Sequence, residues 1–238
     1  MVTLKKLRSF GVKLAERLKL YEERPREYMK LVLQLIKPVL VNSKQCTVLD
    51  LGCGSGWLVE SLQRIAMTIG VDIKLSPSWS NRKGYFVVAD ARALPIVNDA
   101  IDIAIALSLL EHVDNWEQIL HEVFRILRPG GVFIIQLPNL KYLIEPHTKF
   151  PLLYLMPQLL KQAITRATGC AEIEFSCTIE NVLKKVREIG FEVRGVLHYY
   201  HGKKRTMMKM LAKITTPHGF FLVLQKPSII RRSTPNIT

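Results

Sequence analysis

A glycine-rich turn between two regular segments constrains the fold of this chain more than any other feature. Residues 47–58 read TVLDLGCGSGWL, a buried strand followed by Gly52, Gly54 and Gly56 and then by the start of a helix. Glycines let a ligand approach the backbone closely, and the first turn of a helix offers N–H groups that lack intrahelical partners. The segment therefore predicts a strand-turn-helix unit that binds a small molecule, with a turn that binds nothing as the alternative.

The spacing of the glycines separates this turn from a dinucleotide-binding one. The dinucleotide fingerprint has a third glycine where this chain has Trp57, because the helix must pack closely there. Asp50 precedes the first glycine by two residues. With that carboxylate, the segment resembles the first motif of the class I S-adenosylmethionine (SAM) dependent methyltransferases.

Acidic residues follow the next two predicted strands. Residues 66–73 form a short apolar strand that reaches Asp72, where a carboxylate can accept from both hydroxyls of a ribose. Residues 85–95 begin as a third strand and continue through Asp90 and Ala91 to a Leu-Pro pair, as in the adenine-binding loop of the same family. The resemblance implies that Asp90 accepts from the adenine amino group and that the Ala91 backbone contacts the ring.

The pattern continues in the same order along the chain. A fourth strand over 101–108 runs into LEHV at 110–113, which resembles the family's loop beneath the methionine part of the cofactor. A helix over 116–127 has a one-sided apolar stripe suited to packing on a sheet. Arg-Pro-Gly-Gly at 128–131 is expected to close it before a fifth strand over 132–137.

The resemblance covers residues 45–140 closely and 176–226 in outline, and it implies a fold, a cofactor and a binding site. The fold is an α/β, Rossmann-like, seven-stranded, mostly parallel sheet with an antiparallel last strand and helices on both faces. The cofactor is SAM. The implied cofactor-binding residues are Asp50, Gly52, Cys53, Gly54, Gly56, Asp72, Ile73, Asp90, Ala91, Arg92, Leu107, Ser108 and His112.

We divide the chain into five parts. Helices over 1–44 cap the fold, 45–140 form the SAM-binding core, 141–177 form an insertion or lid on the acceptor side, 178–226 complete the sheet, and 227–238 are a tail expected to be disordered. In the fourth part, a helix near 180–189 with Thr178 as its N-cap ends at Gly190. A strand over 191–200 follows this helix. The last strand, 219–225, is expected to pair antiparallel with the strand over 191–200.

One stretch departs from the family pattern. Between Asp72 and Asp90 the family has a full helix, whereas residues 74–84 are short and rich in Pro, Ser and Asn. We expect one or two helical turns at most, and a thinner outer wall for the adenine pocket. Leu75 and Trp79 are candidates to cover that pocket, although core packing is the alternative role for Trp79.

The net charge of +14 is unevenly distributed. Residues 1–44 carry +7, residues 45–140 carry −3 and residues 141–238 carry +10. Such flanks favour an acidic acceptor, RNA or peripheral contact with an anionic membrane, although solvated helix faces would give the same charge.

The main hypothesis is a SAM-dependent methyltransferase acting on a small-molecule or lipid-linked acceptor. A tRNA or rRNA methyltransferase and a non-catalytic SAM-binding protein are the alternatives, and no oligomeric state is predicted.

Catalysis of methyl transfer mainly requires positioning of the acceptor and exclusion of water, because the sulfonium is already activated. A protonated oxygen or nitrogen acceptor also needs a base, for which His112 and His147 are the first candidates, followed by His198 and Tyr199. Support of the methionine pocket is the alternative role for His112. Aromatic and apolar residues in the 141–177 insertion favour a hydrophobic or ring-bearing acceptor.

Cysteine spacing and hydropathy argue against other classes of protein. The four cysteines show no C-x-x-C pair, so we expect neither a metal site nor a disulfide framework. The sequence has no apolar run of the roughly 18 residues typical of a membrane span, and its first residues mix charges into what a signal peptide keeps apolar. These features predict a cytoplasmic location.

Overall fold

A seven-stranded sheet forms the centre of the molecule. The computed structural model describes residues 25–41, 46–141, 148, 150, 152–168, 173–199, 217 and 219–228. The strands are β1 (Thr47–Leu51), β2 (Met67–Asp72), β3 (Tyr85–Val88), β4 (Ile101–Leu107), β5 (Leu127–Pro138), β6 (Glu192–Tyr199) and β7 (Gly219–Gln225). Their order in the sheet is β3-β2-β1-β4-β5-β7-β6. β1 to β5 pair in parallel, and β7 runs antiparallel to both β5 and β6, which confirms the predicted fold.

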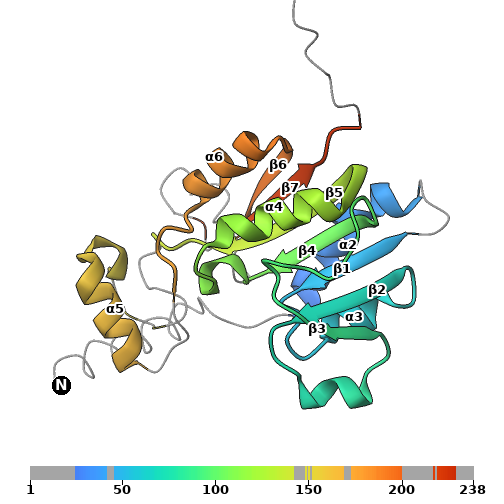
Figure 1. Ribbon diagram of the computed structural model, residues 1–238. Helices are drawn as coiled ribbons and strands as arrows, with labels where there is room; N and C mark the ends of the chain where they lie inside the picture. The colour runs from blue at the N-terminus through green and yellow to red at the C-terminus, as the bar shows by residue number, and fades with distance from the viewer. Residues whose placement is uncertain are drawn as a thin grey trace, which may run out of the picture.

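Helices cover both faces of this sheet (Figure 1). They are α2 (Pro25–Val41), α3 (Trp57–Leu62), α4 (Trp116–Ile126), α5 (Gln158–Ala167) and α6 (Ile179–Ile189), with short 3-10 helices η1 (Pro77–Asn81), η2 (Leu110–His112) and η3 (Leu153–Leu155). None of the helices within the described ranges is long and apolar enough to cross a membrane.

The hydrophobic core consists of two layers, one on each face. Successive strand residues point to opposite faces, so Leu49 joins the layer under α4 and α6 while Val48 joins the layer under α2 and α3. Strands buried on both faces need nearly continuous apolar runs, and β4 has this pattern. The sheet therefore holds the strand ends, where the predicted site lies, in fixed positions.

The junction between α4 and β5 differs from the prediction. Leu127 already pairs with Ile101, so Arg-Pro-Gly-Gly at 128–131 lies inside β5 and does not separate the helix from the strand. The register shifts between Ile101 and Ile103, and Gly130 has a φ of +82°. An irregularity of this kind lets a proline and two glycines lie within the strand, whose pairing with β4 resumes at Val132.

Other local predictions agree with the structure. The hydroxyl of Thr178 caps α6 by accepting from the N–H of Asn181 at 3.3 Å, and Gly190 ends the helix with a φ of +109°. The connection from β2 to β3 contains only η1, as the sequence of 74–84 predicts. Residues 1–24, His147 and residues 229–238, on which further predictions were made, lie outside the described residues.

Candidate cofactor site

The glycine turn after β1 is closed by packing at two positions and open at one. Gly52, Gly54 and Gly56 have φ values of +67°, +51° and +79°. A Cβ at Gly52 would lie 2.8 Å from Leu109 Cδ1, and one at Gly56 would lie 2.5 Å from the ring of Phe86. A Cβ at Gly54 would meet nothing within 4 Å. The backbone at Gly54 is therefore accessible to a ligand.

Neighbouring elements hold this turn in place. The N–H groups of Gly52 and Cys53 both donate to the carbonyl of Val71 in β2, at 2.8 and 3.1 Å. The indole N–H of Trp79 in η1 donates to the carbonyl of Gly54 at 2.9 Å, and the Trp79 ring is stacked on Phe86 with centroids 4.9 Å apart. Trp79 is buried, so it packs in the core and also fixes the turn, a contact that the sequence did not predict. Leu75, the other candidate cover, is highly exposed.

Asp72 lies at the end of β2, next to the open position. Its Oδ2 accepts from the N–H of Gly54 at 2.9 Å and its Oδ1 accepts from the N–H of Lys74 at 3.1 Å. A carboxylate has about four acceptor sites, so both oxygens can accept further hydrogen bonds. The backbone thus orients the group that is predicted to bind the ribose, while the following Ile73 is exposed.

The floor of the turn is acidic. Asp50 in β1 is only 3% exposed. Burial, and then the charge of Asp72, raise the pKa of Asp50 from 3.8 to about 8. Burial, followed by Asp50 and Asp72, raises the pKa of the Cys53 thiol to about 12, so this cysteine is an inert neighbour. A cation bound here would favour the charged form of Asp50 and lower its pKa.

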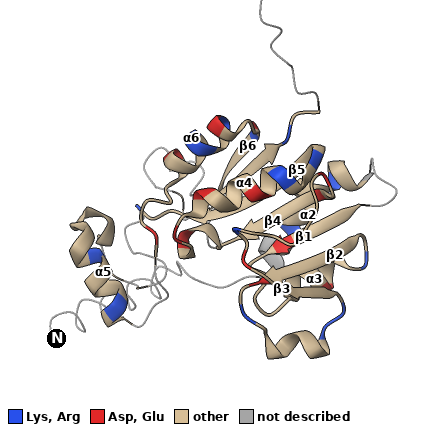
Figure 2. Cartoon of the chain, in the orientation of Figure 1, with Lys and Arg blue, Asp and Glu red and all other residues tan. Residues whose placement is uncertain are grey.

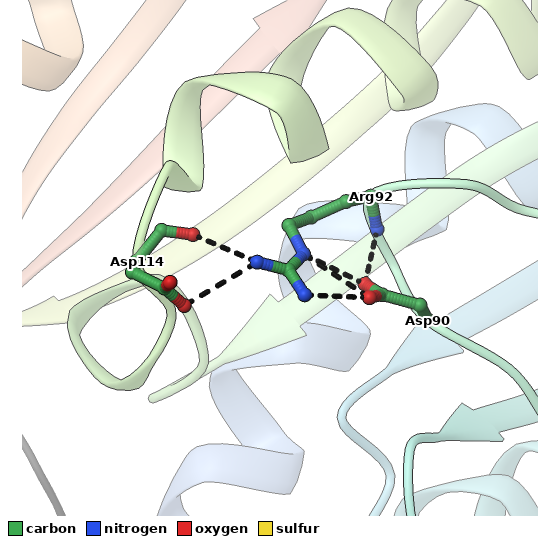
Figure 3. Close-up of polar contacts among 3 residues, drawn as sticks. All are labelled: Asp90, Arg92 and Asp114. Atoms are coloured by element: carbon green, nitrogen blue, oxygen red, sulfur yellow. Dashed lines mark hydrogen bonds and ion pairs between the residues drawn. The ribbon is translucent and has the colours of Figure 1, made fainter.

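An arginine joins the loop after β3 to the loop after β4 (Figure 3). Arg92 Nη2 donates to Asp90 Oδ2 at 2.7 Å, and the Arg92 backbone N–H donates to Asp90 Oδ1 at 2.9 Å. Arg92 Nη1 also contacts Asp114 Oδ1 at 3.3 Å. These hydrogen bonds from Arg92 hold the pKa of Asp90 below its ordinary value. The predicted adenine-binding carboxylate is therefore fixed in one orientation, and Ala91 lies between the two bonded residues.

The end of β4 supplies the remaining predicted cofactor residues. Leu107 ends the strand, and Ser108 has a φ of +51°, a conformation that non-glycine residues rarely adopt. The Ser108 hydroxyl donates to Oε1 of Gln136 in β5 at 2.5 Å, which stabilises this bend. His112 closes η2, with its Nε2 3.9 Å from Oε1 of the buried Glu111.

A cavity of about 160 Å³ adjoins His112. It is lined by His112, Asp114, Gln162, Thr165, Arg166, Ile173, Glu174 and Phe175. Three of these residues belong to α5, within the predicted insertion. Asp114 also contacts Arg92, so the cavity borders the loop that carries Asp90. The structure thus places a partly open pocket of mixed polarity next to the first candidate base.

The predicted site residues gather at the carboxyl ends of β1, β2, β3 and β4, with three exceptions. His147 lies outside the described residues. His198 and Tyr199 lie on β6, which β5 and β7 separate from β4, and the His198 ring contacts Phe220 edge-on at 5.5 Å. Among the residues that the structure describes, no group of three or more His, Cys, Asp and Glu side chains could hold a metal ion.

Sequence reasoning missed several residues of the site. Gln136 and Asp114 contact Ser108 and Arg92, which are distant from them in sequence. Helix α5 lies in a stretch with no motif. The signal for Trp79 was present, because a buried indole N–H needs an acceptor, but its partner could not be chosen from sequence.

Comparison with known proteins identifies the domain. Residues 49–135 match the family model described as a methyltransferase domain. Solved structures of SAM-dependent methyltransferases share the fold. The protein from Mesorhizobium loti aligns with a TM-score of 0.59 and 18% identity, over 80% of this chain and 97% of that one. The protein from Archaeoglobus fulgidus aligns with a TM-score of 0.59 and 18% identity, over 83% and 94%.

Residues 49–135 match a methyltransferase domain, and the fold around them is that of solved SAM-dependent methyltransferases. A curated relative, a probable SAM-dependent methyltransferase of Mycolicibacterium smegmatis, is 28% identical over 177 residues. That alignment covers 72% of this chain, and the chain spans 60% of the relative's length. The matched methyltransferase domain contains the glycine turn, Asp72, Asp90 and His112, whereas α5, α6, β6 and β7 lie beyond it. SAM is the cofactor of such a domain.

Proposed function

We propose that this protein transfers the methyl group of SAM to a small-molecule or lipid-linked acceptor. The observation that carries the proposal is the open backbone at Gly54 beside the oriented carboxylate of Asp72. A side chain at Gly54 would occupy this space, and the acidic floor at Asp50 suits a ligand that carries positive charge. The residues present therefore fit SAM, whose sulfonium and ammonium groups are cationic.

The residues of the site have separate roles in this proposal. Asp72 accepts from the ribose hydroxyls and Asp90 from the adenine amino group. Asp50, whose pKa of about 8 keeps it largely protonated near neutral pH, loses its proton when a cation binds nearby. SAM supplies a methyl group already activated for displacement. The protein then needs to hold the acceptor in line and exclude water, which can account for a large part of a rate enhancement.

The cavity beside His112 is the proposed acceptor site. Ile173 and Phe175 offer apolar contacts, while Thr165 and Gln162 offer hydrogen-bonding groups. His112 lines the cavity and accepts the proton of an oxygen or nitrogen acceptor, and the nearby Glu111 carboxylate stabilises the resulting imidazolium. This arrangement favours a small acceptor, or the reactive end of a larger one.

The proposal is tested with radiolabelled SAM and a cell extract, separated afterwards into lipid, RNA, protein and small-molecule fractions. We expect label in the lipid or small-molecule fraction, and none with the Gly54→Val protein as control. His112→Gln should slow labelling by about 100-fold while SAM still binds, if the acceptor loses a proton.

The other outcomes contradict the proposal in different ways. Label confined to RNA would indicate an RNA methyltransferase. Tight SAM binding measured by calorimetry, without label in any fraction, would indicate a non-catalytic SAM-binding protein.

A further inference from the structure

The segment formed by η3 and α5 carries an exposed apolar surface. Four leucines are exposed within residues 152–160: Leu152, Leu155, Leu159 and Leu160. Leu159 is 82% exposed and Leu155 is 66% exposed. Single exposed leucines are ordinary on a protein surface, but several so close together indicate an interaction site. We call these four residues the leucine face.

Helix α5 has three sides with different surroundings. Ile164 points inward and packs with Phe150 and Leu153. Gln162, Thr165 and Arg166 line the cavity beside His112. Residues one turn apart share a side of a helix, so Leu159 and the exposed Ala163 continue the leucine face along the outer side. One helix thus links the cavity to the outer surface.

The charges of α5 are all of one sign. Lys161 and Arg166 are its charged residues, and Figure 2 shows the helix with Lys and Arg but no acidic side chain, away from the sheet. Arg166 is exposed and lies on the side of the helix next to Leu159, whereas Lys161 Nζ lies 5.3 Å from the centre of the Phe175 ring, on the side of the cavity. Apolar side chains flanked by basic ones are typical of helices that lie at the surface of an anionic membrane.

We infer that the leucine face docks on an anionic lipid surface. Charge decides between this partner and a second copy of the chain. Two copies, each with a net charge of +14, would repel, whereas anionic lipid attracts the same residues. The leucines insert among the acyl chains, and the basic residues remain at the level of the headgroups.

Docking in this way brings the cavity to the lipid surface. Because Gln162, Thr165 and Arg166 lie on the neighbouring side of the same helix, an acceptor embedded in the membrane reaches His112 over a short path. This consequence for the acceptor rests on the proposed methyl transfer. The docking itself does not, and it is tested without SAM.

The test is co-sedimentation of the full chain with vesicles. Phosphatidylcholine vesicles containing about one third phosphatidylglycerol provide the anionic surface, and pure phosphatidylcholine vesicles are the comparison. We expect binding to the anionic vesicles and a loss of about tenfold or more in the Leu159→Gln/Leu160→Gln protein. Leu75→Gln, which replaces a leucine that is 73% exposed in the connection between β2 and β3, should bind as the unmodified chain does.

A second measurement locates the contact. Hydrogen exchange of α5 amides should slow when anionic vesicles are added, and exchange in β3 should not change. Equal binding of the unmodified and Leu159→Gln/Leu160→Gln proteins would overturn the inference, because charge elsewhere would then explain the binding. Absence of binding to anionic vesicles would overturn it too, as would a dimer that dissociates on the same substitutions. Calorimetry with SAM alone tests the proposed function separately.

Discussion

The backbone N–H of Gly54 donates to Oδ2 of Asp72 at 2.9 Å. This hydrogen bond joins the first glycine turn to the end of the neighbouring strand. The open position and the carboxylate beside it are therefore one structural unit. Substitutions at the two residues affect the same ligand for different reasons, steric at Gly54 and electrostatic at Asp72.

Gly54→Val should abolish measurable SAM binding by calorimetry, because the new side chain fills the open position above the turn. Valine is also strained at a φ of +51°. Gly130→Val is the matched control, since Gly130 also has a positive φ but lies in β5 away from the turn. We expect the control to lose stability and keep its SAM affinity. Normal affinity in Gly54→Val would contradict the assignment of the turn.

Asp72→Ala should weaken SAM binding by about 1 to 3 kcal/mol, the range for losing hydrogen bonds to a charged group. The measurement is the calorimetric dissociation constant. Asp99→Ala removes another carboxylate, one that pairs with Lys226 at 2.6 Å, and should leave the constant unchanged. If Asp72→Ala binds SAM as tightly as the unmodified protein, another residue holds the ribose.

Arg92→Ala should weaken SAM binding by about threefold to tenfold, because the carboxylate of Asp90 loses the contacts that orient it. The pKa of Asp90 should rise toward its ordinary value, since hydrogen bonds from Arg92 are the main cause of its lowering. As pH falls toward 3.8, the ordinary pKa of this carboxyl, SAM affinity should therefore decline earlier in the variant than in the unmodified protein. Asp114→Ala, which leaves the Asp90 contact intact, should show the smaller effect, and equal effects would argue against this role for Asp90.

Asp50 should make both stability and SAM binding depend on pH. Its pKa is raised from 3.8 to about 8 in the folded protein, so its protonated form is favoured by folding. Its stabilising contribution is complete below the ordinary pKa and is lost as pH rises toward 8. Between about pH 5 and pH 8, the free energy of unfolding of the unmodified protein should therefore fall by on the order of 1 kcal/mol or more relative to that of Asp50→Asn. Urea unfolding at several pH values measures the difference.

Cationic SAM should release a proton from Asp50 near neutral pH. Calorimetry in two buffers with different ionisation enthalpies measures this release, which should disappear in Asp50→Asn. SAM binding without proton release in the unmodified protein would show that the protonation of Asp50 does not change when the cofactor binds.

The sequence predicted the sheet because its signals are local. Strands buried on both faces need apolar runs, and the carboxylates at Asp72 and Asp90 mark where two strands end. The N-cap at Thr178 and the stop at Gly190 depend on single residues and were confirmed. The boundary at Leu127 was missed because its pairing with Ile101 depends on a strand distant in sequence, which outweighs the turn preference of Pro-Gly-Gly.

The site was predictable only in part, since motifs name residues but not their partners. The roles predicted for Asp72, Asp90 and His112 stay predictions until SAM binding is measured. The contact between Arg92 and Asp114 spans two loops, and the cavity depends on α5, whose sequence has no motif. Long-range packing decides such features, so composition alone could not reveal them.

The hydrogen bond from Trp79 to the carbonyl of Gly54 gives the protein a built-in optical reporter. Indole emission responds to the polarity and hydrogen bonding around the ring, and this ring is tied to the residue over which a ligand would settle. Titration followed by intrinsic fluorescence would then register occupancy without a label, with the signal traced by its disappearance in Trp79→Phe.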